Sequence, residues 1–429
     1  AASSFYGQAL ASAGDFNGDT CEDLLVGAPF YDLPATSAGA AYLYYGGPVP
    51  DTSVDHIFSG AVGSDYYGIA VSSAGDFNND SFDDIVIGAY QADWGSFSNS
   101  GKAYVYYGGP APNFVVDKIL IGQADGERFG YALTSGKVNG DGSSDIAVGA
   151  YSYDSSGINQ GRIYLFYGGV SPDTLIDLIV TGDSAGYKFG WSLATGRVSN
   201  DAAPDMIMGT DGYSMNAFAA GKLYVFFGGA GFDNNEDYSY TLGRLQDDFL
   251  GDAVASAVDI GEDGFDEMIT GMPGNDDGAS NAGGSILFSG GAVIAPDTSI
   301  LGNGTDEEMG ESVVLWKGYG SADAYVFAAG ASAYDSFRGR IALYRKPSSA
   351  SCCVHRGNVD GVIGPAGPVD VSDLTFLVAF LFSGGTTPPC VDEGNVDGVI
   401  GPAGPIDVSD LTYLVAFLFS GGAAPPPCA

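Results

Sequence analysis

Residues 14–29 read GDFNGDTCEDLLVGAP, in which an acidic loop leads directly into a short apolar strand that ends in glycine. Nearly the same pattern returns at residues 75–90 as GDFNNDSFDDIVIGAY. Self-similarity at a fixed spacing is the signature of a repeat architecture, so these two stretches indicate a repeated structural unit.

Three landmarks define this unit along the chain. The first is a glycine that follows an aromatic or apolar residue, and it recurs every 59 to 62 residues, at Gly7, Gly68, Gly130, Gly190, Gly251 and Gly310. The second is the glycine of VGAP-like stretches, at Gly27, Gly88, Gly149, Gly209, Gly271 and Gly330. The third is an aromatic strand that runs into Gly-Gly, ending at Gly47, Gly109, Gly169, Gly229 and Gly291. The chain therefore contains six units of about 60 residues.

Each unit carries four short strand signals separated by turn residues. In unit two they fall at residues 69–75, 83–89, 102–108 and 118–122. No helical periodicity persists beyond a few positions. Four-stranded antiparallel units repeated in series predict an all-β, six-bladed β-propeller over residues 1–346. A linear β-solenoid is the competing architecture, but its coils are much shorter than these units.

Composition limits the function classes. The chain has 15 Lys and Arg against 53 Asp and Glu, a formal charge of −38, which argues against nucleic acid as a partner. The longest apolar run, residues 374–382, is half of the roughly 18 residues that a membrane span needs, so we expect no membrane insertion. Clustered carboxylates in a chain rich in glycine and aromatic residues indicate neutralisation by a divalent cation.

A Phe-Gly or Tyr-Gly landmark followed by GDFNGDTCEDLLVGAP resembles the FG-GAP repeat of integrin α-chain propellers and related bacterial surface proteins. The resemblance covers roughly residues 5–345 and is clearest in units one and two. It implies a propeller whose acidic loops bind cations.

The acidic loops of units one and two place oxygen-bearing side chains at positions 1, 3, 5 and 9. These residues are Asp15, Asn17, Asp19 and Asp23 in loop one, and Asp76, Asn78, Asp80 and Asp84 in loop two. Alternating oxygens in a tight loop suit Ca²⁺, which takes six to eight oxygen ligands, better than Mg²⁺. The resemblance implies that the backbone carbonyls of Cys21 and Phe82, at position 7, complete each shell. The alternative is an Asx-turn without a metal.

The later units depart from this pattern. Unit five keeps Asp259, Asp263 and Glu267 but has Gly261 at position 3, which predicts a weaker or water-completed site with the carbonyl of Phe265. At position 1, units three and four have Lys137 and Arg197. We hypothesise that these cations replace the metal and form salt bridges to the remaining acids of their own loops. Those acids are Asp141 and Asp145 in unit three, which also has Asn139, and Asp201 and Asp205 in unit four. Unit six has lost the pattern, so we expect three propeller calcium ions.

The sequence offers little for catalysis. His56 and His355 are the two histidines of the chain, and each is expected at the surface. No phosphate-binding Gly-Lys-Ser loop is present. The chain has 53 acids, so many carboxylate pairs are possible and none of them is evidence for a glycosidase-like active site. We therefore expect a protein that is not an enzyme.

Residues 357–385 and 394–422 are near copies, and each joins an acidic Gly/Pro-rich loop to an apolar helix. They resemble the duplicated calcium loop–helix of dockerin modules, which implies a small EF-hand-like helical domain at 357–429, with repeats at 357–390 and 394–428. The matching ligand candidates are Asn358, Asp360, Asp370, Asp373, Asn395, Asp397, Asp407 and Asp410. An inserted Gly-Pro segment lengthens each loop by four residues. The helices pack on each other, form a docking surface, or do both, and we expect two calcium ions here.

Cysteines indicate the compartment. Cys352 and Cys353 lie in a linker at residues 347–356, and Cys390 and Cys428 follow the two repeats. This even set favours disulfides of three possible connectivities over a zinc site, and hence an oxidising environment. A removed secretory signal or trimming explains the start at Ala1. We expect a secreted, extracellular or cell-surface protein.

Unit six ends at GRIALYRKP without a fourth strand signal, and the residues before Gly7 are too few to supply one. An open sheet edge invites strand addition from another chain. A three-stranded blade, or a strand lost with a processed leader, is the alternative. We expect self-association into a surface layer or filament by strand addition or head-to-tail contacts between propeller and tail. The alternatives are a monomeric adhesion module that binds glycan or protein through propeller loops, and a scaffold-targeted non-catalytic part of a secreted hydrolase system.

Overall fold

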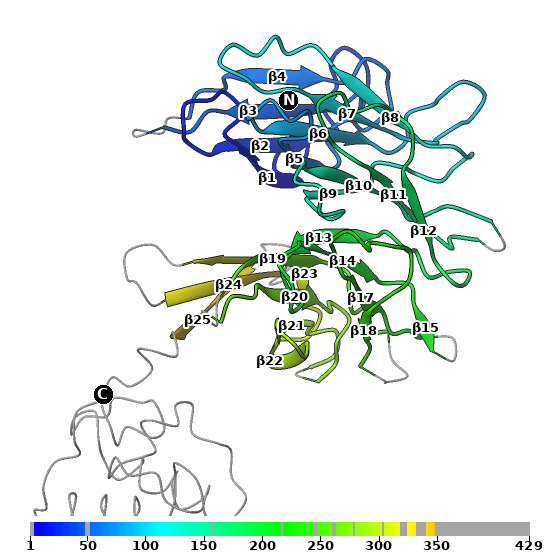
Figure 1. Cartoon of the computed structure of the whole chain (residues 1–429). Coiled ribbons are helices and arrows are strands. Elements are labelled where there is room, and N and C mark those ends of the chain that lie inside the picture. Colours follow the sequence, from blue (N-terminus) through cyan, green and yellow to red (C-terminus); the bar gives the residue numbers. More distant parts are fainter. Residues whose placement is uncertain are drawn as a thin grey trace, which may run out of the picture. The chain divides into compact units, whose positions relative to one another are not determined.

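The computed structural model (Figure 1) describes residues 4–47, 52–155, 158–215, 218–242, 247–259, 263–277, 279–302, 304–317, 324–331 and 340–347. The chain divides into two compact units, of which the first contains residues 1–317 and 326–344 and the second contains residues 318–325 and 345–429. The predicted dockerin-like module and the linker before it lie outside the described residues.

Short antiparallel strands form one sheet per sequence repeat. Sheet one contains β1 (Ala9–Gly14), β2 (Asp23–Ala28), β3 (Ala40–Tyr44) and β4 (His56–Ser59). Sheet two contains β5 (Val71–Gly75), β6 (Asp84–Ala89), β7 (Lys102–Tyr106) and β8 (Lys118–Ile121). Sheet three contains β9 (Ala132–Gly136), β10 (Asp145–Ala150), β11 (Arg162–Phe166) and β12 (Leu178–Thr181). The four strands of each sheet lie in chain order.

The second half of the first unit continues this arrangement. Sheet four contains β13 (Ser192–Gly196), β14 (Asp205–Thr210), β17 (Lys222–Phe226) and β18 (Tyr238–Tyr240). Sheet five contains β19 (Val254–Val258), β20 (Glu267–Gly271), β21 (Gly284–Ser289) and β22 (Ala295–Leu301). Within the described residues, sheet six has three strands, β23 (Met309–Lys317), β24 (Ala324–Ala331) and β25 (Arg340–Pro347). A hairpin that the sequence reading did not predict pairs β15 (Ser214–Met215) with β16 (Phe218–Ala219).

Burial explains why the second strand of each repeat is the most apolar. All six residues of β6, DIVIGA, are buried, because this strand lies between two neighbours in its sheet and is covered on both faces. The outer strand β8 is only partly buried. Continuous apolar runs therefore mark inner strands, as expected for strands buried on both faces.

The hydrophobic core lies between successive sheets. Leu25 and Leu43 of sheet one pack with Ile85 and Ile87 of sheet two, and all four side chains are fully buried. Similar clusters join sheets two and three, three and four, and four and five. Repeated four-stranded antiparallel sheets that pack face to face in series are consistent with the predicted β-propeller.

The two landmark glycines meet at the junctions between sheets. A Cβ added to Gly27 would collide with the backbone carbonyl of Gly68 in the next sheet, and Gly68 has a φ of +85°. The same collision recurs at four further pairs, Gly88–Gly130, Gly149–Gly190, Gly209–Gly251 and Gly271–Gly310. Glycine is thus required where neighbouring backbones touch, which explains why the sequence repeats these two positions.

No helix in the described part of the chain has the length and apolar character needed to cross a membrane.

Candidate metal-binding loops

Loop one joins β1 to β2 and is folded by bonds between its own side chains and backbone. The amide of Asp19 donates to Asn17 Oδ1 at 2.8 Å, and the amide of Cys21 donates to Asp19 Oδ1 at 2.9 Å. The amide of Thr20 donates to Asp15 Oδ2 at 3.0 Å. Short polar side chains that accept from the backbone two residues ahead form tight turns, so this sequence folds into a compact acidic loop.

Loop two joins β5 to β6 and repeats this geometry. Asn78 Oδ1 accepts from the amide of Asp80 at 2.9 Å, and Asp80 Oδ1 accepts from the amide of Phe82 at 3.1 Å. The carboxylate of Asp76 accepts from the amides of Asp80 at 2.8 Å and Ser81 at 3.0 Å. The two loops therefore share a conformation as well as a sequence pattern.

The acid at position 9 anchors each loop to its sheet. Asp84 is fully buried, and its carboxylate accepts from the amides of Phe77 at 3.1 Å, Asn78 at 3.2 Å and Gly108 at 2.9 Å. Burial raises the pKa of Asp84 to about 7, although these hydrogen bonds oppose the shift. The equivalent Asp23 is also buried, which raises its pKa to about 6. A nearby cation would stabilise the ionised form of both groups.

One carboxylate oxygen of loop one is available to bind a hard cation. Asp15 Oδ1 is buried and has no hydrogen-bond partner, which is costly for a carboxylate oxygen. Among the described residues, no three Asp, Glu, His or Cys side chains converge into a ready-made metal centre. The oxygen set of loop one also includes the amide of Asn17 and the carbonyl of Cys21, neither of which is an acid. This donor set fits a divalent cation that takes oxygen ligands.

Loop five keeps part of the arrangement. The carboxylate of Asp259 accepts from the amides of Asp263 at 3.1 Å and Gly264 at 2.8 Å. The amide of Phe265 donates to Asp263 Oδ1 at 3.1 Å, and Glu267 at position 9 is buried. Gly261 lies outside the described residues, so the third position of this loop stays a prediction.

The expected salt bridges in loops three and four are not formed. Lys137 and Arg197 are both exposed. The ion pairs within the described ranges are Lys188–Asp211 and Lys222–Glu236, so the hypothesis that Lys137 and Arg197 bridge their own loops is wrong.

Neutral donors satisfy the carboxylates of these two loops instead. In loop three, the side-chain amide of Asn139 donates to Asp141 Oδ2 at 3.0 Å and to Asp145 Oδ1 at 3.3 Å. In loop four, Ser199 Oγ donates to Asp205 Oδ1 at 3.0 Å. Hydrogen bonds from uncharged groups therefore hold both loops, and no internal cation is needed for this.

The predicted tail sites fall outside the part of the chain that the structure describes. The tail ligands Asn358, Asp360, Asp370, Asp373, Asn395, Asp397, Asp407 and Asp410 lie outside the described residues, as do Cys352, Cys353, Cys390, Cys428 and His355. Cys21, at position 7 of loop one, is a free cysteine. His56 begins β4 and stacks on Phe114 at 3.8 Å between ring centroids. Burial lowers the pKa of this imidazole.

The sequence pattern did not predict a role for the acid at position 8 of loops two and five. Asp83, next to the anchor Asp84, turns to the preceding repeat and accepts from the amide of Asp15 through Oδ2 at 2.8 Å. Asp266 accepts in the same way from the amide of Arg197 at 2.8 Å. The signal was the recurrence of two adjacent acids at the start of the second strand in units one, two and five.

A line of aromatic rings also went unpredicted. The rings belong to residues within three positions of a landmark glycine in units one to four, namely Phe30, Tyr66, Tyr90, Tyr131 and Trp191. Successive ring centroids along this line are 5.1, 5.5, 5.7 and 4.8 Å apart. Aromatic residues within three positions of these landmark glycines were the available signal.

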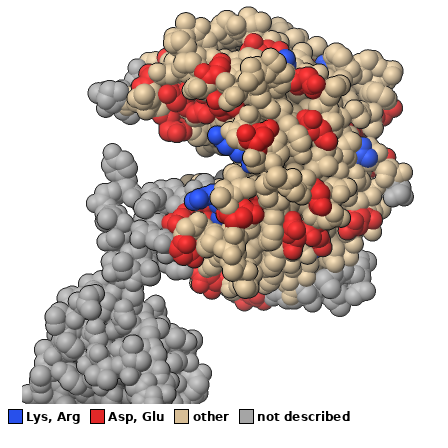
Figure 2. Space-filling model, viewed as in Figure 1, with Lys and Arg blue, Asp and Glu red and all other residues tan. Residues whose placement is uncertain are grey.

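This aromatic line leads to an acidic cavity of about 310 Å³ whose lining includes Asp211, Asp252, Glu308 and Glu311. The indole nitrogen of Trp191 donates to Asp252 at 3.1 Å. Burial and the neighbouring Asp211 raise the pKa of Asp252 to about 7, while the Trp191 bond opposes the shift. Figure 2 shows that acidic side chains also outnumber basic ones on the visible face.

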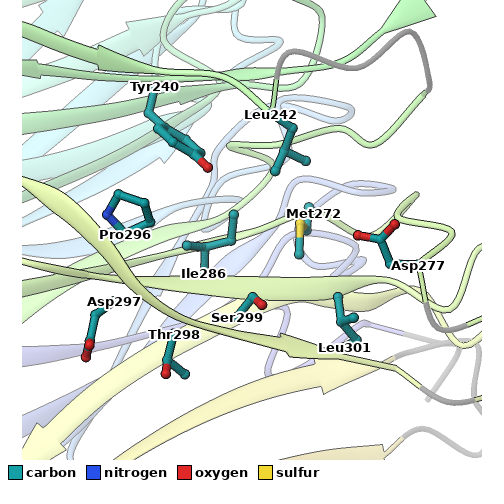
Figure 3. Close-up of a pocket in the computed structure, with 10 residues that line it drawn as sticks. All are labelled: Tyr240, Leu242, Met272, Asp277, Ile286, Pro296, Asp297, Thr298, Ser299 and Leu301. Carbon is teal, nitrogen blue, oxygen red and sulfur yellow. The ribbon is translucent and has the colours of Figure 1, made fainter. Parts of the chain in front are cut away.

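Of two other hollows, the first has a mixed polar and apolar lining and the second is largely apolar. One of about 230 Å³ lies between sheets four and five, where Tyr240, Met272, Ile286 and Leu301 line it (Figure 3). The other, of about 630 Å³, lies where sheet one meets sheet six. Leu10 is one of its lining residues and is 64% exposed, so this junction is more open than those between the other sheets.

Comparison with known proteins assigns a class to the repeats. The FG-GAP repeat model matches residues 6–44, 67–106 and 129–166, which contain the first three strands of sheets one, two and three. The chain therefore carries three FG-GAP repeats in this region.

Integrin alpha chains are among its relatives. Integrin alpha-8 of Gallus gallus is 31% identical over 229 residues, which are 50% of this chain and 20% of the relative. Integrin alpha-PS2 of Drosophila melanogaster is 32% identical over 175 residues, 37% of this chain and 12% of the relative. Integrin alpha-7 of Mus musculus is 34% identical over 178 residues, 40% of this chain and 14% of the relative. The chain thus spans a fifth or less of the length of these relatives.

Proposed function

We propose that this chain is a non-enzymatic extracellular protein of adhesion or assembly, whose sheets are stabilised by calcium and which self-associates into a surface layer or filament. Its similarity to integrin alpha chains supports a binding role rather than catalysis. Two acidic loops of common geometry, with the orphaned Asp15 Oδ1 in the first, support cation binding.

Calcium would act here by stabilising the fold. Asp15, Asn17, Asp19, Asp23 and the carbonyl of Cys21 would hold one ion in loop one, and the equivalent residues of loops two and five would hold two more. An ion that binds only the folded state stabilises that state by mass action. It also neutralises part of a formal charge of −38, which otherwise favours expansion of the chain.

The observation that carries self-association is the edge of sheet six. Within the described ranges, β25 pairs with β24 on one side and with no strand on the other, whereas the other five sheets each have a fourth strand. Ile341 of β25 is 72% exposed. An unpaired edge strand with an exposed apolar side chain is a template for a strand from a second copy. Addition that does not close a ring generates a filament.

Electron microscopy of the full chain in calcium, and then in excess chelator, tests this proposal. We expect ordered polymers in calcium that disperse on chelation. Ile341→Lys should abolish them, because a charge on an edge strand opposes pairing. Val170→Lys, which changes a residue 79% exposed between β11 and β12, serves as the matched control. Polymers that survive Ile341→Lys would exclude strand addition at β25.

A monomeric adhesion module is the second candidate. Trp94 and Phe97 stand at the tip of the β6–β7 loop and are 44% and 38% exposed. Exposed aromatic residues on a loop suit contact with a glycan or a protein surface. Dispersed particles in both calcium and chelator, together with glycan-array binding that Trp94→Ala abolishes, would favour this candidate over self-association.

A further inference from the structure

We propose that Asp83 is a positioning residue for the metal site of loop one, although its own neighbours in the sequence, Phe82 and Asp84, belong to loop two. This inference rests on the proposed function of loop one in binding calcium. It places the metal site of loop one at a junction between two sheets rather than within a single loop.

The geometry at the first junction carries the assignment. Asp83 Oδ2 lies 2.8 Å from the amide nitrogen of Asp15, which is the residue at position 1 of loop one. Gly14, immediately before it, has a φ of +67°, and a Cβ there would collide with the Asp83 carboxyl group. The carboxylate of Asp83 thus fixes the backbone from which the Asp15 side chain projects.

A backbone bond from the same neighbouring sheet holds the next residue of loop one. The amide of Gly109, which follows β7, donates to the carbonyl of Phe16 at 2.8 Å. Positions 1 and 2 of loop one are therefore held from sheet two, while Asp23 anchors the loop within sheet one through the amides of Phe16 and Gly46. The loop is fixed from both sides.

The side-chain contact recurs at one other junction and is replaced at two more. At the junction of sheets four and five, Asp266 accepts from the amide of Arg197 at 2.8 Å and donates its own amide to the Arg197 carbonyl at 2.8 Å. At the junction of sheets two and three, the Ser144 amide donates to the Asp76 carbonyl at 3.3 Å. At the junction of sheets three and four, the position is Pro204, which has neither a side-chain acceptor nor an amide hydrogen.

The role of Asp83 follows from the physics of outer ligand shells. Groups that orient a ligand without touching the metal typically change its affinity by 10- to 100-fold when removed. Asp83 also adds one negative charge beside loop one, which attracts a cation. Removing this carboxylate should therefore weaken calcium binding at loop one. Loop two should keep its affinity for calcium, because Asp83 is not one of the proposed ligands of loop two.

Hydrogen–deuterium exchange of the full chain, titrated with calcium and read on peptides that cover each loop, resolves the two sites. We expect Asp83→Ala to raise the calcium midpoint of loop one about 10-fold and to change that of loop two by less than about twofold. Asp83→Asn, which keeps an acceptor oxygen but not the charge, should give an intermediate shift. Equal shifts in both loops, or a shift in loop two alone, would overturn the assignment.

Glu22→Ala is the matched control. Glu22 holds the same position 8 in loop one, where its carboxylate accepts from Ser12 Oγ of its own sheet. This variant should leave the midpoint of loop two unchanged. If neither loop of the wild type responds to calcium, the proposed function fails. The contact with Asp83 is then tested by hydrogen–deuterium exchange measured in excess chelator. Faster exchange of the Asp15 amide in Asp83→Ala then supports the contact, and unchanged exchange refutes it.

Discussion

Replacing Asp84 by alanine should destabilise the protein whether or not calcium is present. The carboxylate of this residue is fully buried and accepts three backbone bonds, from Phe77, Asn78 and Gly108. Alanine leaves the amides of Asn78 and Gly108 without an acceptor, whereas the Phe77 amide keeps its bond to the Gly75 carbonyl at 2.9 Å. Each such donor costs about 1–3 kcal/mol, and the total is partly offset because a desolvated carboxyl group is removed with it.

We therefore expect the free energy of unfolding to fall by roughly 2–4 kcal/mol, which corresponds to a decrease of roughly 4 °C in Tm for a unit of this size. Denaturant unfolding followed by circular dichroism, in excess chelator and in excess calcium, measures it. Asp80→Ala is the matched comparison, because Asp80 is an exposed acid of the same loop. It should lower the stability in calcium and leave the chelated protein within about 1 kcal/mol of the wild type.

The two variants separate two roles of the loop acids. A chelated Asp84→Ala protein that unfolds within about 1 kcal/mol of the wild type would refute the anchoring role of the position-9 carboxylate. An Asp80→Ala protein that loses as much stability in chelator as in calcium would refute the view that Asp80 acts through a bound ion.

Three further predictions concern charges. Lys137→Asp restores an acid at position 1 of loop three, so isothermal titration calorimetry should detect one additional calcium ion; unchanged stoichiometry would count against the loop pattern. Lys188→Met should cost about 3–5 kcal/mol in denaturant unfolding, since the buried Asp211 loses its partner at 2.7 Å, and Asp211→Asn in the same chain should restore most of it. In chelator, Asp252 should make its full contribution to the free energy of unfolding below about pH 4. This contribution should be lost as the pH rises to about 7, because burial raises the folded-state pKa of Asp252 to about 7. Asp252→Asn should therefore reduce the loss of unfolding free energy between pH 5 and pH 7, by up to about 1.4 kcal/mol per pH unit, and an unchanged slope would contradict this.

The repeat pattern was sufficient to predict the strands. The signals of unit two at residues 69–75, 83–89, 102–108 and 118–122 overlap β5 to β8, because strand length and turn chemistry are local properties. The β15–β16 hairpin was missed because its two-residue strands leave no periodicity to detect. Local pattern therefore predicts the strands of the repeated sheets, including the three-residue β18, but not a hairpin whose strands have two residues each.

The candidate site was predictable only within each loop. Asp15, Asn17 and Asp19 do fold one compact turn, as their spacing indicated. The salt bridges expected of Lys137 and Arg197 failed because sequence spacing does not show that neutral donors already satisfy the acids. Contacts between sheets, such as Asp83 with Asp15, join residues 68 positions apart and have no local signature.

Two adjacent acids at the start of β6 illustrate what the sequence alone hides. Side chains alternate in direction along a strand, so neighbouring residues serve different surroundings even when they are chemically equal. Asp84 turns inward and anchors its own sheet, whereas Asp83 reaches the preceding one. The pair therefore couples two sheets through one short segment. Repeat three illustrates its loss, because Lys137 removes the first ligand of the loop and Pro204 removes the neighbouring acceptor at the same junction.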